Sequence, residues 1–146
     1  MNQKVTYTHR LILPVDTNHH GTLYAGSLLR IALEAAYVAA HQAVGNGANL
    51  LLRRVLNLEC QRPVPEGSLV EIRGMALHLT RAYLVVGLIG TPLDDVSGPW
   101  MDALMGFVQV DAQGQPTPFP SELTSPDPGP EWQELHERME KLLRIR

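Results

Sequence analysis

The sequence has a single cysteine, Cys60, and this scarcity excludes two classes of protein. One cysteine forms no internal disulfide and supplies no cluster of metal-binding thiolates. It is consistent with a protein of a reducing compartment. Because Cys60 lies inside a strand-like run, we expect it to be a buried small hydrophobe rather than a nucleophile.

An excess of basic charge, a long apolar run and a leader-like N-terminus are also missing. The formal net charge is −3 with 18% charged residues, which gives no electrostatic footprint for nucleic acid. No apolar run approaches the ~20 residues of a membrane span. Residues 1–10 lack the apolar core of a signal peptide, so we expect a cytoplasmic protein that binds neither a membrane nor nucleic acid.

The most pronounced feature of the sequence is the stretch 21–44. The chain has 146 residues, a length that is typical of one domain. Ala, Leu, Ile and Val occupy nearly every side of this stretch, which is typical of a buried helix. The exceptions share one stripe at helical spacing: Arg30, Glu34, Tyr37 and His41. The run Gly45-Asn46-Gly47 predicts the end of the helix.

Five other stretches alternate apolar and polar residues as strands do. They cover residues 4–13, 50–61, 68–80, 82–91 and 100–110. One strand, a long helix and four successive strands predict an α+β fold, because long antiparallel strands that curl around the helix bury it most economically.

The chain ends in a proline-rich segment and a second candidate helix. Residues 113–130 contain six of the eleven prolines and are predicted to be an extended linker. In residues 131–146, the apolar side chains fall on one helical face, which predicts an amphipathic helix that docks on the rest of the chain. These side chains are Trp132, Leu135, Met139 and Leu142. The main domain would then cover residues 1–112.

Three motifs resemble those of a known family. The first leads into the candidate helix and reads Asp16-Thr17-Asn18-x-x-Gly21-x-Leu23-Tyr24-x-Gly26-x-Leu28-Leu29. The second is LECQRPVPEGSLVEI over residues 58–72, and the third is TRAYL over residues 80–84, of which only Arg81 clearly matches. Together they span roughly residues 7–111, and they resemble the hotdog-fold acyl-CoA thioesterases.

The resemblance implies a hotdog fold, in which a curled antiparallel sheet of about five strands wraps a long central helix. It also implies a homodimer or a dimer of dimers, with active sites between subunits. The expected substrate is an acyl thioester of coenzyme A, with no other cofactor and no metal. The N-terminus of the central helix would give backbone N–H groups to the thioester oxygen, lined by Tyr24, Ala25 and Gly26.

The sequence departs from the family at the catalytic carboxylate. One branch has an Asp on the central helix where this chain has Leu33, and the 4-hydroxybenzoyl-CoA branch has an Asp in the preceding loop where this chain has Asn18. Leucine moves no proton, and asparagine can orient a water or hold the thioester carbonyl without acting as a base. Glu34 and Asp16 are therefore the candidate acids.

Each of these candidates has a structural alternative. Glu34 is spaced to form an ion pair with Arg30 at i,i+4, and Asp16 is of a turn-capping residue type. His19 and His20 are candidates for substrate binding or for the base, and their alternative is a solvated loop.

The basic residues suggest where the phosphates of coenzyme A would bind. Four arginines are candidates for binding the phosphates of coenzyme A: Arg53, Arg54, Arg62 and Arg81. We assign only Arg81 to this role, because arginines at strand ends are commonly just solvated.

The chain is either an acyl-CoA thioester hydrolase or a non-catalytic hotdog protein that binds an acyl thioester or another apolar ligand. A hotdog dehydratase is disfavoured, because its catalytic histidine pattern is missing.

Overall fold

The structure is a computed structural model and describes residues 4–45, 47–93, 98–123 and 126–144. The main elements follow in this order: β1 (Thr6–Leu11), α1 (Ala25–Val44), β2 (Leu50–Cys60), β3 (Leu69–Leu79), β4 (Leu84–Pro92), β5 (Met101–Val110), β6 (Pro116–Thr117) and α2 (Gln133–Arg144). Two short 3-10 turns cover Pro14–Asp16 and Pro130–Trp132. Asn46 of the expected helix stop and residues 145–146 of the expected C-terminal helix lie outside the described residues.

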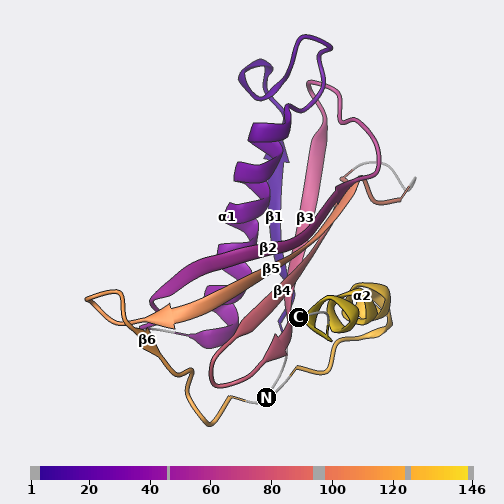
Figure 1. Cartoon of the computed structure of the whole chain (residues 1–146). Coiled ribbons are helices and arrows are strands. Elements are labelled where there is room, and N and C mark those ends of the chain that lie inside the picture. The colour runs from indigo at the N-terminus through magenta and orange to yellow at the C-terminus, as the bar shows by residue number, and fades with distance from the viewer. Residues whose placement is uncertain (1–3, 46, 94–97, 124–125, 145–146) are drawn as a thin grey trace.

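The strands form one antiparallel sheet in the order β1-β3-β4-β5-β2, and the short β6 pairs with β5. α1 packs along one face of this sheet and α2 lies against the other face (Figure 1). β1 and β2 are its two edges. The arrangement confirms the predicted α+β hotdog fold. In the part of the chain that the structure describes, no helix is long and apolar enough to cross a membrane.

Small side chains bring α1 close to the sheet. Ala32, Ala36 and Ala40 are completely buried on the face that meets the strands. Opposite them, a Cβ atom at Gly74 of β3 would lie 2.9 Å from the Cβ of Ala39, so only glycine fits there without a shift. The sheet can therefore curl tightly around the helix.

The prediction of a helix buried on all sides is wrong for a single chain. α1 buries only the face that meets the sheet, and its other face exposes a ridge of Leu29, Leu33 and Tyr37. The helix also begins at Ala25 rather than at Gly21, because Gly21 has a left-handed φ of 74° and Tyr24 is extended. It ends, as expected, where Gly45 takes a φ of 100°.

Cys60 is exposed, which corrects the expectation that it is buried. It is the last residue of β2, and β2 is an edge of the sheet. No described strand covers that edge. The side chain donates a hydrogen bond from Sγ to the carbonyl of Arg62, at 3.2 Å.

The segment that follows β5 returns to the core. β6 pairs with β5, and Phe119 is completely buried among the residues that face α1. Arg81 Nε donates a hydrogen bond of 2.7 Å to the carbonyl of Phe119. The first part of the expected linker 113–130 is thus anchored to the sheet.

The C-terminal helix docks on the sheet as predicted. Trp132, Leu135 and Met139 are buried, and Leu142 is partly buried against the same cluster. The strand side chains of that cluster are Met75, Leu77, Val85 and Leu104. At the edge of the contact, Asp102 of β5 is only 8% exposed.

An ion pair between Asp102 of β5 and Arg138 of α2 links the helix to the sheet. Asp102 accepts hydrogen bonds from Arg138 Nη1 at 2.7 Å and from Gln61 Nε2 at 2.9 Å. The hydrogen bond to this carboxylate raises the pKa of Arg138 further above its ordinary value. The same Nη1 also donates to Asn57 Oδ1, at 2.8 Å.

We predict that Arg138→Met lowers the free energy of unfolding by about 1–3 kcal/mol, because it leaves the buried Asp102 carboxylate without its cation. The measurement is urea unfolding of the full chain. Arg144→Met, which removes an exposed arginine from the same helix, is the matched control and should have little effect. Adding Asp102→Asn to Arg138→Met should recover part of the loss; equal stabilities of Arg138→Met and the control would contradict the proposed tie.

Candidate functional site

The loop between β1 and α1, residues 12–24, folds into a narrow extension beside the start of α1 (Figure 1). Thr17 and Leu23 form an antiparallel bridge across the loop, and Asn18 N donates to Thr22 O at 2.8 Å. The N–H of Tyr24 donates to the carbonyl of Asp16 at 2.9 Å. These bonds fix the position of Asn18 relative to the helix N-terminus.

Asn18 uses its side-chain oxygen to hold the loop. Oδ1 accepts hydrogen bonds from His20 N at 2.9 Å, from Thr22 N at 3.2 Å and from Thr22 Oγ1 at 3.2 Å. Among the described residues, no acceptor lies within hydrogen-bond reach of the Nδ2 amide group. Asn18 can therefore offer a ligand a hydrogen-bond donor, but hardly an acceptor.

The N-terminus of α1 has no side-chain cap. Tyr24 is the N-cap residue, and the first hydrogen bond within the helix runs from Leu28 N to Tyr24 O. The N–H groups of Ala25, Gly26 and Ser27 thus have no acceptor within the helix. With no acidic residue in the first turn, this end carries a positive partial charge that suits an oxyanion.

Tyr24 and Gly26 fit together at this helix end. A Cβ atom on Gly26 would lie 2.6 Å from Cε2 of the Tyr24 ring. The space left by the glycine is therefore filled by Tyr24 itself, whose ring is otherwise exposed. Gly26 allows this ring to lie against the first turn.

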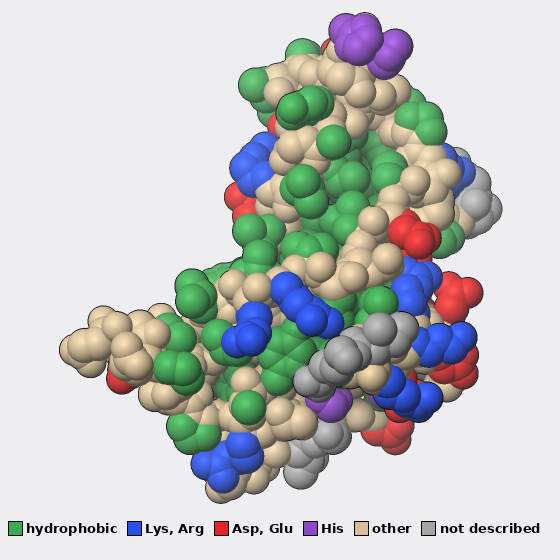
Figure 2. Space-filling view, viewed as in Figure 1, with side chains coloured by type: hydrophobic (Ala, Val, Ile, Leu, Met, Phe, Trp, Pro, Cys, Tyr) green, Lys and Arg blue, Asp and Glu red, His purple; other side chains and the backbone are tan. Residues whose placement is uncertain are grey.

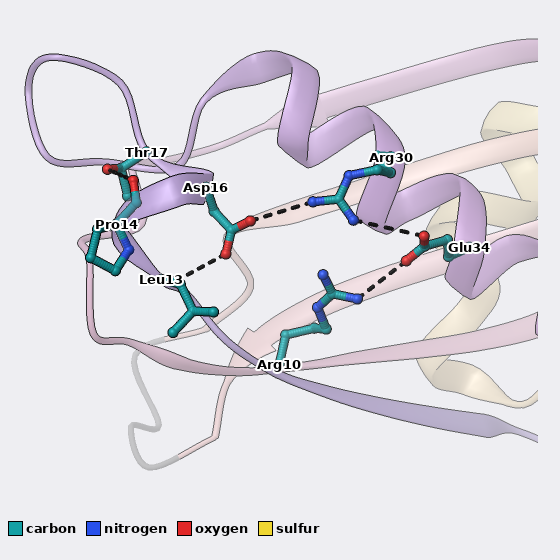
Figure 3. Close-up of polar contacts among 7 residues, drawn as sticks. All are labelled: Arg10, Leu13, Pro14, Asp16, Thr17, Arg30 and Glu34. Carbon is teal, nitrogen blue, oxygen red and sulfur yellow. Dashed lines mark hydrogen bonds and ion pairs between the residues drawn. The ribbon is translucent and has the colours of Figure 1, made fainter.

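Asp16 is 5% exposed, and both of its carboxylate oxygens are engaged. Oδ2 accepts a hydrogen bond of 2.9 Å from the N–H of Leu13, and Oδ1 accepts one of 3.3 Å from Arg30 Nη2 (Figure 3). Asp16 therefore has the structural role that the sequence offered as the alternative to catalysis. Its carboxylate holds the 3-10 turn against α1.

Glu34 continues the same chain of charges. It pairs with Arg10 Nη1 at 3.2 Å and with Arg30 Nη1 at 3.7 Å, so Arg30 joins Asp16 to Glu34 (Figure 3). Its side chain is 54% exposed. Glu34 lies two turns after Gly26, or about 12 Å along the helix, which is too far to act on a thioester at the N-terminus of its own helix.

The remaining predicted site residues are spread out. His19 and His20 are exposed with ring centroids 3.9 Å apart, and Figure 2 shows histidine side chains at the outer end of the molecule, over this loop. Arg81 lies in the β3–β4 turn, at the far end of the sheet from the loop (Figure 1). The fold thus gathers Asn18, Tyr24, Ala25 and Gly26, and leaves Arg81 elsewhere.

Sequence reasoning missed Arg10 as a member of the site. Arg10 is on β1, and its contact with Glu34 on α1 depends on how the helix crosses the sheet. No local sequence pattern therefore predicts this contact. The two residues line a pocket of about 380 Å³ between β1 and α1, together with Thr8 and Val38. The i,i+4 spacing did reveal the Arg30–Glu34 pair.

Solved structures of similar fold are acyl-CoA thioesterases. A hexameric acyl-CoA thioesterase has a TM-score of 0.81 at 23% identity, over 96% of this chain and 88% of that one. The acyl-CoA hydrolase of Bacillus cereus has a TM-score of 0.80 at 18% identity, over 97% and 85%. The acyl-CoA hydrolase of Staphylococcus aureus, solved with butyryl coenzyme A and coenzyme A, has a TM-score of 0.78 at 23% identity, over 97% and 88%.

At these identities the structures show that the fold is shared. No curated protein matches the sequence. The family is shown by the sequence itself, since the model of the thioesterase superfamily matches residues 20–97. This match covers more than half of the chain and runs through α1, β2, β3 and β4. The chain therefore belongs to the thioesterase superfamily.

Proposed function

We propose that this protein hydrolyses the thioester bond of an acyl-CoA at the N-terminus of α1. The observation that carries the proposal is the pairing of an uncapped helix end with an asparagine whose amide group is free to donate. Membership of the thioesterase superfamily supports the reaction type. The Staphylococcus aureus hydrolase, which shares the fold, was solved with butyryl coenzyme A and supports the substrate class.

The proposed chemistry uses the donors of this helix end. A water attacks the thioester carbon, and the N–H groups of Ala25 and Gly26 stabilise the charge that develops on the carbonyl oxygen. The Nδ2 group of Asn18 adds a donor. Collapse of the tetrahedral intermediate breaks the carbon–sulfur bond, and coenzyme A leaves as the thiol after protonation.

The base is the part of the proposed mechanism that the motif of this chain does not assign, because Asn18 and Leu33 occupy the two positions at which the family resemblance implies an Asp. In the Staphylococcus aureus hydrolase, the Asn and the Asp that were replaced by Ala are separated along the chain as Asn18 and Leu33 are here. By this equal spacing, Asn18 corresponds in our proposal to that Asn, and Leu33, which has no carboxylate, corresponds to that Asp. We propose that Glu34, one residue further along α1, supplies the base to the site of a partner subunit, while Asp16 holds the loop.

The protein is proposed to be a homo-oligomer built from dimers. β2 is an eleven-residue edge strand that exposes Leu51 and Val55, and such an edge invites pairing with a second copy. Two solved proteins of this fold, an acyl-CoA thioesterase and a thioesterase of Yersinia pestis, are hexameric.

We predict that light scattering at micromolar concentration gives a mass that is an even multiple of 16.2 kDa. Leu51→Lys with Val55→Lys should shift the mass toward the single chain, because like charges would then face each other across the edge. A native protein that stays at 16.2 kDa would exclude the shared site.

We predict that Asn18→Ala lowers kcat/KM for acyl-CoA by about 10²-fold, which is the typical effect of removing one oxyanion donor. Thr22→Ala is the matched control, because it removes a hydrogen bond to Asn18 Oδ1 and leaves the amide group in place. Its kcat/KM should stay within a few-fold of wild type. Equal losses in the two variants would indicate that Asn18 acts only by holding the loop.

We predict that Glu34→Gln lowers kcat by about 10²–10⁴-fold, the range for loss of a general base. Its melting temperature should change little, since the ion pairs of Glu34 are exposed. Asp16→Asn should show the opposite pattern, a clear loss of stability with a smaller change in kcat, because its carboxylate is buried and doubly bonded. A wild-type protein that binds acyl-CoA without turnover would replace hydrolysis by binding.

A further inference from the structure

α2 lies against the sheet face opposite α1, and one side of this helix carries titratable groups (Figure 1). His136, Glu140 and Leu143 follow one another at the i,i+4 and i,i+3 spacing that puts side chains on one side of a helix. His136 Nδ1 lies 3.9 Å from Glu140 Oε1. Leu143 is partly buried and packs against the apolar cluster beneath α2. This side of the helix therefore runs along the border of the apolar contact.

A β-bulge in β3 turns a third titratable group toward α2. β3 pairs with β4 regularly up to Ala76 and again from His78, so Leu77 is an extra residue without a partner on β4. Side chains of a regular strand alternate between the two faces of a sheet. Here Ala76 and Leu79 both belong to the cluster that packs on α1, whereas Leu77 belongs to the cluster under α2. The bulge thus resets the alternation, and His78 faces α2.

His78 meets the titratable side of α2 directly. It is half-buried, and it lines one cavity of about 400 Å³ together with Leu143. Burial lowers the pKa of His78, charge on the nearby His136 lowers it further, and Glu140 has a smaller, opposite effect. The docked helix contributes to both unfavourable effects, because it brings His136 close and covers the ring. A proton on His78 is therefore less favourable while α2 is docked.

The other groups around His78 do not compensate for such a proton. β2 contributes two further cations to the same cavity, Arg53 and Arg54. The lining from the β3–β4 turn and from β5 carries no charge at neutral pH and consists of Thr80, Ala82, Tyr83 and Val108. Among the described residues, Glu140 is the carboxylate that acts on His78, and it also faces His136. Protonation of both histidines would therefore gather four cations around one carboxylate.

We propose that His78 and His136 form an acid-sensitive latch, which holds α2 on the sheet at neutral pH and loosens it below about pH 6.5. The uncharged rings tolerate the border of an apolar contact, whereas two imidazolium cations repel each other across it. Loosening of α2 uncovers the apolar strand side chains beneath it: Met75, Leu77, Val85 and Leu104. The latch is independent of the proposed hydrolysis.

The docking of α2 should respond to pH in one direction. Because docking makes a proton on His78 less favourable, docking loses free energy as the pH falls through 6.5, the ordinary pKa of histidine, toward the lowered pKa of the docked form. Above this range the ring is uncharged whether or not the helix is docked, and docking is constant. Arg138 keeps its charge throughout, because its hydrogen bond to Asp102 raises its pKa. It holds the helix while the histidine side loosens.

The test is hydrogen–deuterium exchange of the full chain at about pH 7.5 and about pH 5.5, with each rate divided by the intrinsic rate at that pH. The protection of the α2 amides should fall about threefold to tenfold at the lower pH, as for a pKa shift of up to one unit. The buried strand β5 should keep its protection and is the internal reference.

Three variants assign the effect. His78→Gln with His136→Gln removes both titrating rings and should abolish the pH dependence of α2 protection. His19→Gln with His20→Gln is the matched control, because it removes two exposed histidines from the β1–α1 loop, and it should keep the pH dependence. Glu140→Gln removes the carboxylate that favours the proton on His78 and should enlarge the loss of protection at low pH.

Equal protection of α2 at the two pH values in the wild type would overturn the proposal. A pH effect that survives in the His78 and His136 double variant would do the same, as would one that β5 shares equally, because the whole chain would then be unfolding. If the double substitution itself weakens docking, Glu140→Gln decides, and a loss no larger than that of the wild type contradicts the latch. Hydrogen exchange requires no thioester turnover, so failure of the latch and failure of the proposed hydrolysis are distinguishable.

Discussion

The close approach of α1 to the sheet determines where the other parts of the structure can lie. Completely buried alanines on the helix and Gly74 on β3 leave no room for larger side chains between the two layers. Overpacking such a contact typically costs about 1–3 kcal/mol. Because the helix is held this closely, its N-terminus and the β1–α1 loop occupy a fixed place beside the sheet. The same packing leaves the ridge of Leu29, Leu33 and Tyr37 outside, where a partner subunit can cover it.

Charge then orders the loop against the helix. Asp16, Arg30, Glu34 and Arg10 alternate in sign along one line, from the buried 3-10 turn to the exposed side of β1 (Figure 3). The two carboxylates differ in exposure: Asp16 is enclosed and holds the backbone of Leu13, while Glu34 is open to solvent. Only the open carboxylate is available to a substrate, which is why the proposed base is Glu34.

Local patterns in the sequence predicted the elements well, and they failed where burial depends on distant pairing. Alternation and helical spacing located α1, the five long strands and the face by which α2 docks. They placed Cys60 inside the core, because a strand sequence does not tell that β2 is an edge of the sheet. The contact of Arg10 with Glu34 and the bulge at Leu77 depend on register and crossing geometry, which the chain sets only after folding. Asn18 was found from its motif, but its role as a donor required the hydrogen bonds of the loop.

The proposed division of the site between two subunits can be tested by mixing inactive chains. Asn18→Ala and Glu34→Gln proteins would be unfolded together, refolded together and assayed for acyl-CoA hydrolysis. If Asn18 acts with Glu34 of its partner, each mixed dimer contains one intact site, and random mixing should restore about a quarter of wild-type activity. Activity equal to the average of the two separate variants would contradict a site shared across the interface.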